Sequence, residues 1–554
     1  MSDTIGRTPW WQGAVLYQLY VRSWRDSDGD GYGDLAGIIE RLDHLSWLGV
    51  DGIWLSPTMP SPDDDWGYDV SDYREVHPDL GTLGDLDALV AEAGSRSLRV
   101  LLDLVPNHTS SAHPWFIDAA SGRDSVHRDY YVWADPKPGG DPPNNWLDST
   151  GAPAWHWDAA SGQYYLHNYL VSQPDLNWWL PAVHEEFREI LEFWFDRGVA
   201  GFRIDVAHRL YKDAQLRDNP QLTGPDLLQG RFGLRDVYSA NQPESHEIFR
   251  AWRQLAENRS PARLLLGETW VGDLDRLASF YGRDDELQLA FNFPFLFADF
   301  TAAALSSVVS RTLARLPAGA CPVWTASNHD AGRFPTRWCG GDERKIKLAL
   351  LVLATLPGTT VLYYGDEIGM TNVDVPMGLR QDKMTMDGGN PQGVRDRGRT
   401  PMQWDASASA GFTAEGVRPW LPSGDPSQCN VADQRRNQDS PIWLCRRLLQ
   451  LRRAELGSGV AGFQTLEAPR EVWAYRVGEL AVIANFSDAP VDVGVGDMLL
   501  TTWSADQPDN QVASKAEAGR VHGQVPVPAW SGAVVRYQGP GMFTLPGQNE
   551  MDLL

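Results

Sequence analysis

The residues best suited to chemistry are carboxylates, histidines and an arginine that end or directly follow short apolar runs of the chain. They are Asp103, Asn107, His108, Arg203, Asp205, Glu268, Asn328, His329 and Asp330. Alone, each would be explained as a helix cap, a satisfied polar group or a solvated loop residue. Glycoside hydrolysis needs two carboxylates, one as nucleophile or base and one as proton donor, and a third can bind sugar hydroxyls. Carboxylates and two histidines that follow four apolar runs together favour that chemistry.

Eight apolar runs alternate with amphipathic stretches and must position these side chains. The expected strands are Val15–Tyr20, Gly52–Leu55, Arg99–Val105, Gly201–Asp205, Leu264–Glu268, a run near Leu287–Phe291, Pro322–Thr325 and Thr360–Tyr363. Helical spacing is expected over 35–48, 83–93, 183–197, 244–258, 298–316, 345–356 and 441–454. This alternation predicts an α/β fold, a closed (β/α)₈ TIM barrel. Active sites of such barrels lie at the carboxyl ends of the strands, so the candidate residues should converge there.

The alternation is interrupted by long excursions and then ends. A stretch rich in Trp, Asp, Pro and Gly runs from Pro106 to about Leu176, which predicts an inserted domain after the third strand. From about Gly462 the pattern is all strand, which predicts a C-terminal antiparallel β-sandwich. The expected domains are the barrel at 1–105 and 175–461, the inserted domain at 106–174 and the sandwich at 462–554.

The composition argues against several other classes of protein. The 554 residues carry a formal net charge of −25 and no basic cluster, which disfavours nucleic acid or an anionic membrane surface as a partner. No apolar stretch approaches the roughly 18 residues of a membrane span, and the first residues lack a secretory pattern. The four cysteines form no CxxC pair, so free thiols are expected. A cytoplasmic enzyme is the expectation, and the oligomeric state is left open.

Four motifs make the comparison with a known family specific. They are Asp103-Leu-Val-Pro-Asn-His108, Gly201-Phe-Arg-Ile-Asp-Val-Ala-His208, Leu266-Gly-Glu-Thr269 and Ser327-Asn-His-Asp330. In their order, and over nearly the whole chain, they resemble the α-amylase family, glycoside hydrolase family 13. The resemblance implies that Asp205 is the nucleophile, Glu268 the general acid/base and Asp330 a stabiliser of the transition state. The implied mechanism is double displacement with retention.

The resemblance also gives roles to the polar residues around the carboxylates. Arg203 would orient Asp205 and keep it ionised, because a nearby cation favours the carboxylate. His108 and His329 would bind hydroxyls of the reacting sugar.

Three further motifs are similar to the oligo-1,6-glucosidase and α-glucosidase branch of that family. They are Gly67-Tyr-Asp-Val-Ser-Asp-Tyr73, Gln173-Pro-Asp-Leu-Asn177 and Arg399-Thr-Pro-Met-Gln-Trp404. In that branch the tyrosine matching Tyr68 stacks on the terminal glucose. The residues matching Asp65 and Arg399 pair behind it, so the implied site is a pocket for a chain end. Val206 accompanies α-1,6 activity in the branch, but Ala207-His208 departs from its usual Ile-Asn, so linkage preference stays open.

An acidic loop near the start of the chain resembles a cation site. Asp26, Asp28, Asp30 and Asp34 fall at positions 1, 3, 5 and 9 of a partial EF-hand loop, with the Tyr32 carbonyl at position 7. Position 12 is Gly37 instead of glutamate, which excludes a full EF-hand. The branch resemblance implies one structural Ca²⁺ in this loop, and no organic cofactor is expected.

The expected activity is that of a retaining, exo-acting α-glucosidase on short α-glucoside oligosaccharides, with transglucosylation as a possible companion. The alternative is a glucosyltransferase or isomerase on the same scaffold, either trehalose synthase-like or sucrose-directed, since the same glucosyl-enzyme serves all of them. A distant alternative is a non-catalytic interaction protein like the heavy chains of amino-acid transporters. All three carboxylates are present in this chain, which argues against that class.

Overall fold

The computed structural model describes residues 9–222, 230–384, 395–456, 462–495, 498–503 and 523–537. Within them, eight parallel strands form one sheet in the order β11-β10-β7-β3-β2-β1-β13-β12. A parallel bridge between Phe291 and Val323 joins the two ends of this order and closes the barrel. The strands are β1 Val15–Leu19, β2 Gly52–Leu55, β3 Arg99–Leu104, β7 Gly201–Ile204, β10 Leu264–Gly267, β11 Leu289–Ala290, β12 Val323–Trp324 and β13 Thr359–Tyr363. The predicted barrel is confirmed.

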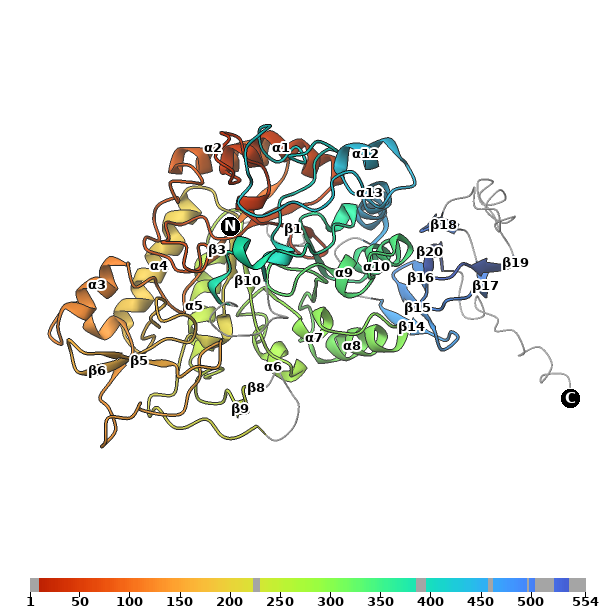
Figure 1. Ribbon diagram of the computed structural model, residues 1–554. Coiled ribbons are helices and arrows are strands. Elements are labelled where there is room, and N and C mark those ends of the chain that lie inside the picture. Colours follow the sequence, from red (N-terminus) through yellow and green to blue (C-terminus); the bar gives the residue numbers. More distant parts are fainter. Residues whose placement is uncertain are drawn as a thin grey trace, which may run out of the picture.

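The helices surround the barrel (Figure 1). They are α1 Leu35–Leu48, α2 Leu83–Ser95, α4 Pro181–Asp196, α5 Ser245–Glu257, α6 Leu274–Ser279, α7 Phe293–Leu296, α8 Ala302–Arg315, α9 Phe334–Arg337, α10 Glu343–Thr355, α12 Val431–Arg436 and α13 Pro441–Leu451. Their starts follow from local capping. Asp34 accepts the Gly37 N–H at α1, and Thr82 with Asp85 forms a capping box at α2. Among the described helices, none is both long and apolar enough to span a bilayer.

Alternate residues of each strand belong to different apolar cores. Leu16, Trp54, Leu101 and Leu266 join a cluster inside the barrel. The intervening residues belong to the large cluster that the strands share with the helices. Successive residues of a strand point to opposite faces, so one set packs against the helices and the other fills the interior of the barrel. Gly201 is needed at the start of β7, because a Cβ there would lie 2.2 Å from the Leu264 carbonyl oxygen.

The excursion between β3 and α4 contains a small sheet of its own. The sheet has the order β4-β6-β5, from β4 Trp133–Ala134, β5 Trp155–Asp158 and β6 Gln163–Leu166. The helix α3 Pro114–Ser121 precedes it in the same excursion. Isolated bridges from His108 to Asp175 and from Tyr131 to Leu176 tie its ends together beside the barrel. In Figure 1 this part is orange and lies at the opposite end of the molecule from the C-terminal strands.

The C-terminal strands form two antiparallel sheets that share one apolar core. The first has the order β14-β15-β16-β20-β18, from β14 Gln464–Leu466, β15 Val472–Val477, β16 Leu480–Asn485, β18 Met498–Thr501 and β20 Ser531–Arg536. The second pairs β17 Val491–Val495 with β19 Gly523–Val527. Ile483 and Val535 of the first sheet and Val493 and Val525 of the second belong to one cluster. This is the predicted β-sandwich; residues 496–497, 504–522 and 538–554 of the expected domain lie outside the described residues.

Candidate active site

One buried arginine connects three carboxylates from three neighbouring strands. Arg203 Nη1 donates to Asp205 Oδ1 at 2.6 Å and to Asp103 Oδ1 at 2.8 Å, and Nη2 lies 3.0 Å from Glu268 Oε2. The strands β3, β7 and β10 are adjacent, and the β3–β7 register places Asp103 directly opposite Arg203. Each carboxylate thus reaches the guanidinium from the end of its own strand.

The turn after β7 sets the distance between Asp205 and Glu268. The Asp205 N–H donates to Leu104 O and the Glu268 N–H to Ile204 O, both at 2.8 Å, so each residue continues its strand's ladder. Val206 then adopts a left-handed conformation with φ 36°, and its N–H donates to Glu268 Oε2 at 2.9 Å. A β-branched residue in this region is strained, and such strain is typical of functional sites.

Burial dominates the electrostatics of the cluster. It raises the pKa of Asp205 well above its ordinary value; the charges of Glu268 and Asp103 add to this, while Arg203 opposes it. Burial likewise raises the pKa of Asp103 to about 6. The effect of Arg203 on Asp205 has the expected direction, since its charge lowers the pKa of that carboxyl. Burial and the neighbouring carboxylates therefore favour the protonated form of Asp205, and Arg203 favours its charged form.

Asp330 is kept ionised by contacts with two arginines and a histidine. Its Oδ1 lies 3.2 Å from both Arg395 and Arg399, and its Oδ2 lies 3.3 Å from His329 Nε2. Burial alone would raise the pKa of Asp330, but the contacts with His329, Arg395 and Arg399 outweigh burial and lower it. A permanently ionised carboxylate at this position can accept hydrogen bonds from sugar hydroxyls.

Tyr68 and His329 link the two groups of acids. The Tyr68 hydroxyl donates to Asp103 Oδ2 at 3.0 Å and lies 2.7 Å from His329 Nε2. Gln18 Nε2 lies 2.7 Å from the other ring nitrogen of His329, so its amide donates to a bare Nδ1 and the proton sits on Nε2. Burial lowers the pKa of His329 to about 3, which keeps the ring neutral.

His108 is also neutral and is held between the Asn107 side chain and the backbone of Tyr68. Burial lowers its pKa to about 4. The Asn107 amide contacts Nδ1 at 3.0 Å, which leaves the proton on Nε2, 3.1 Å from the Tyr68 carbonyl oxygen. Lys212, which sequence reasoning missed, donates to Asn107 Oδ1 at 2.8 Å and pairs with Asp175 at 2.6 Å. An isolated lysine in the sequence gave no signal of this role.

The predicted pair between Asp65 and Arg399 is wrong. Asp65 Oδ1 binds Arg395 Nη2 at 2.6 Å, whereas Arg399 donates through Nε to the His329 carbonyl and through Nη2 to Asp330. Both arginines belong to the segment after β13, four residues apart. The segment turns between them through η6, Arg395–Gly398, so that Arg395 faces the β2 loop and Arg399 lies beneath Asp330.

The acidic loop brings together three of its four predicted carboxylates. Asp26, Asp28 and Asp34 each offer an oxygen within 4.8 Å of the others. Asp30 stands outside this trio: its Oδ1 accepts the Tyr32 N–H at 2.7 Å, and burial together with the charges of Asp28 and Asp26 raises its pKa. Among the described residues, no lysine or arginine forms an ion pair with the trio. Three carboxylates without a basic partner fit a hard divalent cation.

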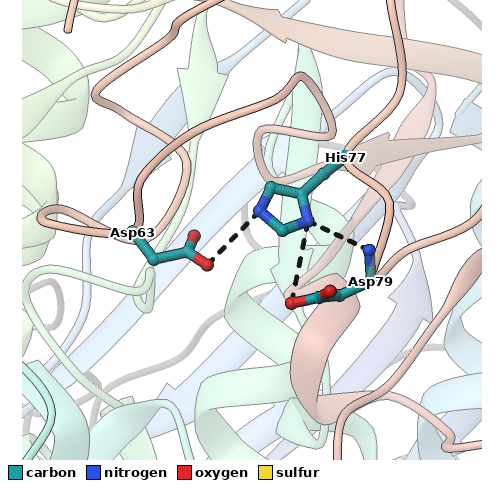
Figure 2. A group of neighbouring side chains, drawn as sticks. All are labelled: Asp63, His77 and Asp79. Atoms are coloured by element: carbon teal, nitrogen blue, oxygen red, sulfur yellow. Dashed lines mark hydrogen bonds and ion pairs between the residues drawn. The ribbon is translucent and has the colours of Figure 1, made fainter. Parts of the chain in front are cut away.

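A second group that could hold a cation is formed by Asp63, His77 and Asp79 (Figure 2), but an arginine already neutralises its carboxylates. His77 Nε2 lies 3.3 Å from Asp63, and His77 Nδ1 accepts the Asp79 N–H at 3.2 Å. Arg22 pairs with Asp63 at 2.8 Å and with Asp79 at 3.8 Å. Because a guanidinium occupies the place of a cation, we interpret this group as a support for the loop after β2.

Comparisons with known proteins agree with this geometry. The family described as "Alpha amylase, catalytic domain" matches residues 18–458. A "Probable alpha-glucosidase" of Rhizobium meliloti (strain 1021) is 40% identical over 461 residues, which cover 80% of this chain and 83% of that protein. An "Oligo-1,6-glucosidase" of Heyndrickxia coagulans is 36% identical over 80% of this chain and 85% of its own. Among solved structures, an alpha-glucosyl transfer enzyme, XgtA, is similar with a TM-score of 0.85 and 35% identity, covering 96% of this chain and 100% of its own.

The closed barrel, its paired carboxylates and these relatives together identify a glycoside hydrolase. The chain belongs to the α-amylase family, glycoside hydrolase family 13, and to its α-glucosidase and oligo-1,6-glucosidase branch.

Proposed function

We propose that the protein is a retaining, exo-acting α-glucosidase that releases terminal glucose from short α-glucosides. The observation that carries this proposal is the Arg203 cluster. Asp205 and Glu268 bind the two terminal nitrogens of the same guanidinium, at 2.6 Å and 3.0 Å, so one side chain holds both carboxylates as a close pair. Retaining enzymes hold their two carboxyl groups about 5 Å apart, while inverting enzymes need room for a water molecule between them.

The first step of the proposed reaction breaks the glycosidic bond. Asp205 Oδ attacks the anomeric carbon, and Glu268 in its protonated form gives its proton to the leaving oxygen. A covalent glucosyl ester on Asp205 results. This step requires a proton on Glu268 and a charge on Asp205. In the second step Glu268 removes a proton from water, which attacks the ester and restores Asp205.

The surrounding residues would bind the terminal sugar. Asp330, permanently ionised, would accept hydrogen bonds from ring hydroxyls. His108 and His329 would offer Nε2 to the sugar in exchange for their contacts with Tyr68. Tyr68, whose ring lies parallel to that of His329, would stack on the sugar face. The pair of Asp65 and Arg395 would stand beyond the sugar and stop a chain from passing through.

A second candidate activity is transfer of the glucosyl group to an acceptor other than water. The similarity to an alpha-glucosyl transfer enzyme, at 35% identity over nearly the whole chain, favours it. Both activities share the glucosyl ester, and only the acceptor differs.

Product analysis separates these possibilities. The protein is incubated with maltose, isomaltose, sucrose and trehalose, and the sugars formed are resolved by chromatography. Glucose as the main product supports hydrolysis, new oligosaccharides support transfer, and an isomer of the substrate supports an isomerase. No turnover of any α-glucoside would contradict the enzyme assignment.

We also propose that the acidic loop binds one structural Ca²⁺ through Asp26, Asp28 and Asp34, with Asp30 and the Tyr32 carbonyl nearby. The ion would neutralise the trio and fix the start of α1, which Asp34 caps. It would take no part in the acid/base chemistry. The cytoplasmic location and the absence of nucleic-acid partners stay predictions from the sequence.

A further inference from the structure

Asp382, which lies after β13, holds the arginine of the pocket wall by two parallel contacts. Its Oδ2 accepts from Arg395 Nε at 3.0 Å and its Oδ1 from Arg395 Nη2 at 2.5 Å. Oδ2 also lies 3.3 Å from the Arg395 backbone nitrogen. The Asp382 side chain is fully buried, and that of Arg395 is 14% exposed. Such a two-point contact fixes the plane of a guanidinium as well as its charge.

A neighbouring aspartate binds the chain in the opposite direction. Asp396 Oδ2 accepts the N–H groups of Gln381 at 2.7 Å and Asp382 at 3.2 Å. The carbonyl of Gln381 in turn accepts from Trp66 Nε1 at 3.0 Å, on the loop that follows β2. The backbone leading into Asp382 is therefore held by Asp396 and by Trp66.

This anchoring leaves the remaining edge of Arg395 facing the active site. Nε and one N–H of Nη2 bind Asp382. Nη2 also lies 2.6 Å from Asp65, and Nη1 lies 3.2 Å from Asp330. One guanidinium thus connects a buried structural carboxylate, the pocket wall and the carboxylate assigned to the sugar hydroxyls. Rotation of its plane would move both functional contacts together.

We propose that Asp382 is a positioning residue for the terminal-glucose pocket: it sets the orientation of Arg395 and through it the affinity for a chain end. The proposal rests on the exo-glucosidase function and names the residue that makes its pocket wall rigid. Asp382 touches no substrate. It acts through Arg395, whose contacts with the sugar would be the same in the bound substrate and in the transition state. Removing the Asp382 carboxylate should therefore raise KM and change kcat less.

The test is Asp382→Asn, which keeps the shape of the side chain and removes its charge. We expect KM for maltose to rise about 10-fold to 100-fold, as for misplacement of a binding group by about 1 Å, with kcat falling less than about threefold. The inhibition constant of glucose, which occupies the same pocket without being cleaved, should rise in parallel with KM. The matched control is Asp374→Asn: Asp374 forms a surface pair with Arg397 at 2.7 Å and is 90% exposed, and it should leave both constants unchanged.

A second comparison shows whether the effect passes through Arg395. In the background of Arg395→Lys, which cannot make the two-point contact, adding Asp382→Asn should change KM by less than about threefold, because contacting residues couple and distant ones add. A fully additive effect would overturn the proposal. So would a KM and a glucose inhibition constant within about twofold of wild type in the single variant, whatever its melting temperature.

A second variant covers the case in which Asp382→Asn fails to fold. If Asp382→Asn does not fold, Asp382→Glu keeps the charge but displaces it by one methylene, and a raised KM with nearly normal kcat is expected. An unchanged KM in that variant would overturn the proposal. Direct glucose binding by calorimetry is measured in every folded variant. A wild-type protein that binds glucose but cleaves no α-glucoside would contradict the proposed function, while the comparison of affinities would still test Asp382.

Discussion

Replacing Asp103 by asparagine should shift the acid limb of the pH–rate profile to lower pH. The charge of Asp103 raises the pKa of Asp205, and the two carboxylates share Arg203 Nη1, at 2.8 Å and 2.6 Å. An amide at this position removes the like charge and releases Arg203 for Asp205. Both effects lower the pKa of Asp205, so the nucleophile ionises at lower pH.

The size of the shift follows from the distances. A like charge at close range moves a carboxyl pKa by about one to three units, and the retained Arg203 screens part of this effect. We expect the acid limb to move down by about one pH unit, which corresponds to about 1.4 kcal/mol of differential interaction. The maximal rate should also fall, because the Tyr68 hydroxyl and Arg203 both lose a charged partner.

The assay is the pH dependence of kcat/KM for a nitrophenyl α-glucoside, which reports ionisations of the free enzyme. Asp374→Asn serves as the control, because it removes a carboxylate that is exposed and paired at the surface. An acid limb that stays in place, or moves to higher pH, would refute the coupling of Asp103 to Asp205.

Three further predictions follow from the site and the loop. Asp205→Asn should lower kcat by roughly 10⁴-fold or more with the fold intact, and Glu268→Gln should slow glucosides with poor leaving groups far more than nitrophenyl substrates, as single-turnover kinetics would reveal. Arg395→Ala should lower kcat/KM for maltose about 100-fold by unpairing buried carboxylates, whereas Arg397→Ala in the same segment should change it little; equal losses would contradict the pocket wall. Chelation should lower the melting temperature by a few degrees, and Asp26→Asn should remove that difference; a chelator-insensitive wild type with no bound Ca²⁺ by elemental analysis would contradict the site.

Much of the barrel could be predicted because its signal is local. Strand β2 has the predicted bounds, and the other seven differ only by residues at their ends, since an apolar run between turn residues is visible in a single sequence. Helices such as α1 carry a full amphipathic repeat. The four-residue helices α7 and α9 were missed, because one turn is too short for a periodic pattern.

The candidate site also contains residues that could be predicted from the sequence and residues that could not. Asp205, Glu268 and Asp330 could be placed because they follow apolar strands whose ends meet in any closed barrel. The partner of Asp65 could not, since the choice between Arg395 and Arg399 depends on the path of an irregular segment after β13. Lys212 and Asp382 were missed for a related reason: their roles arise from burial beside another charge, and a sequence does not display burial of single polar residues.

The central claim is that Asp205 forms a covalent glucosyl ester, and mass spectrometry of a trapped intermediate tests it most directly. The protein is treated with a fluorinated α-glucosyl fluoride, whose ester hydrolyses slowly, and is then digested. The account predicts one added fluoroglucosyl group on the peptide that contains Asp205, and none after treatment of Asp205→Asn. A stable adduct on Glu268, Asp103 or Asp330 instead, or turnover with no adduct and inversion of the anomeric centre, would contradict it.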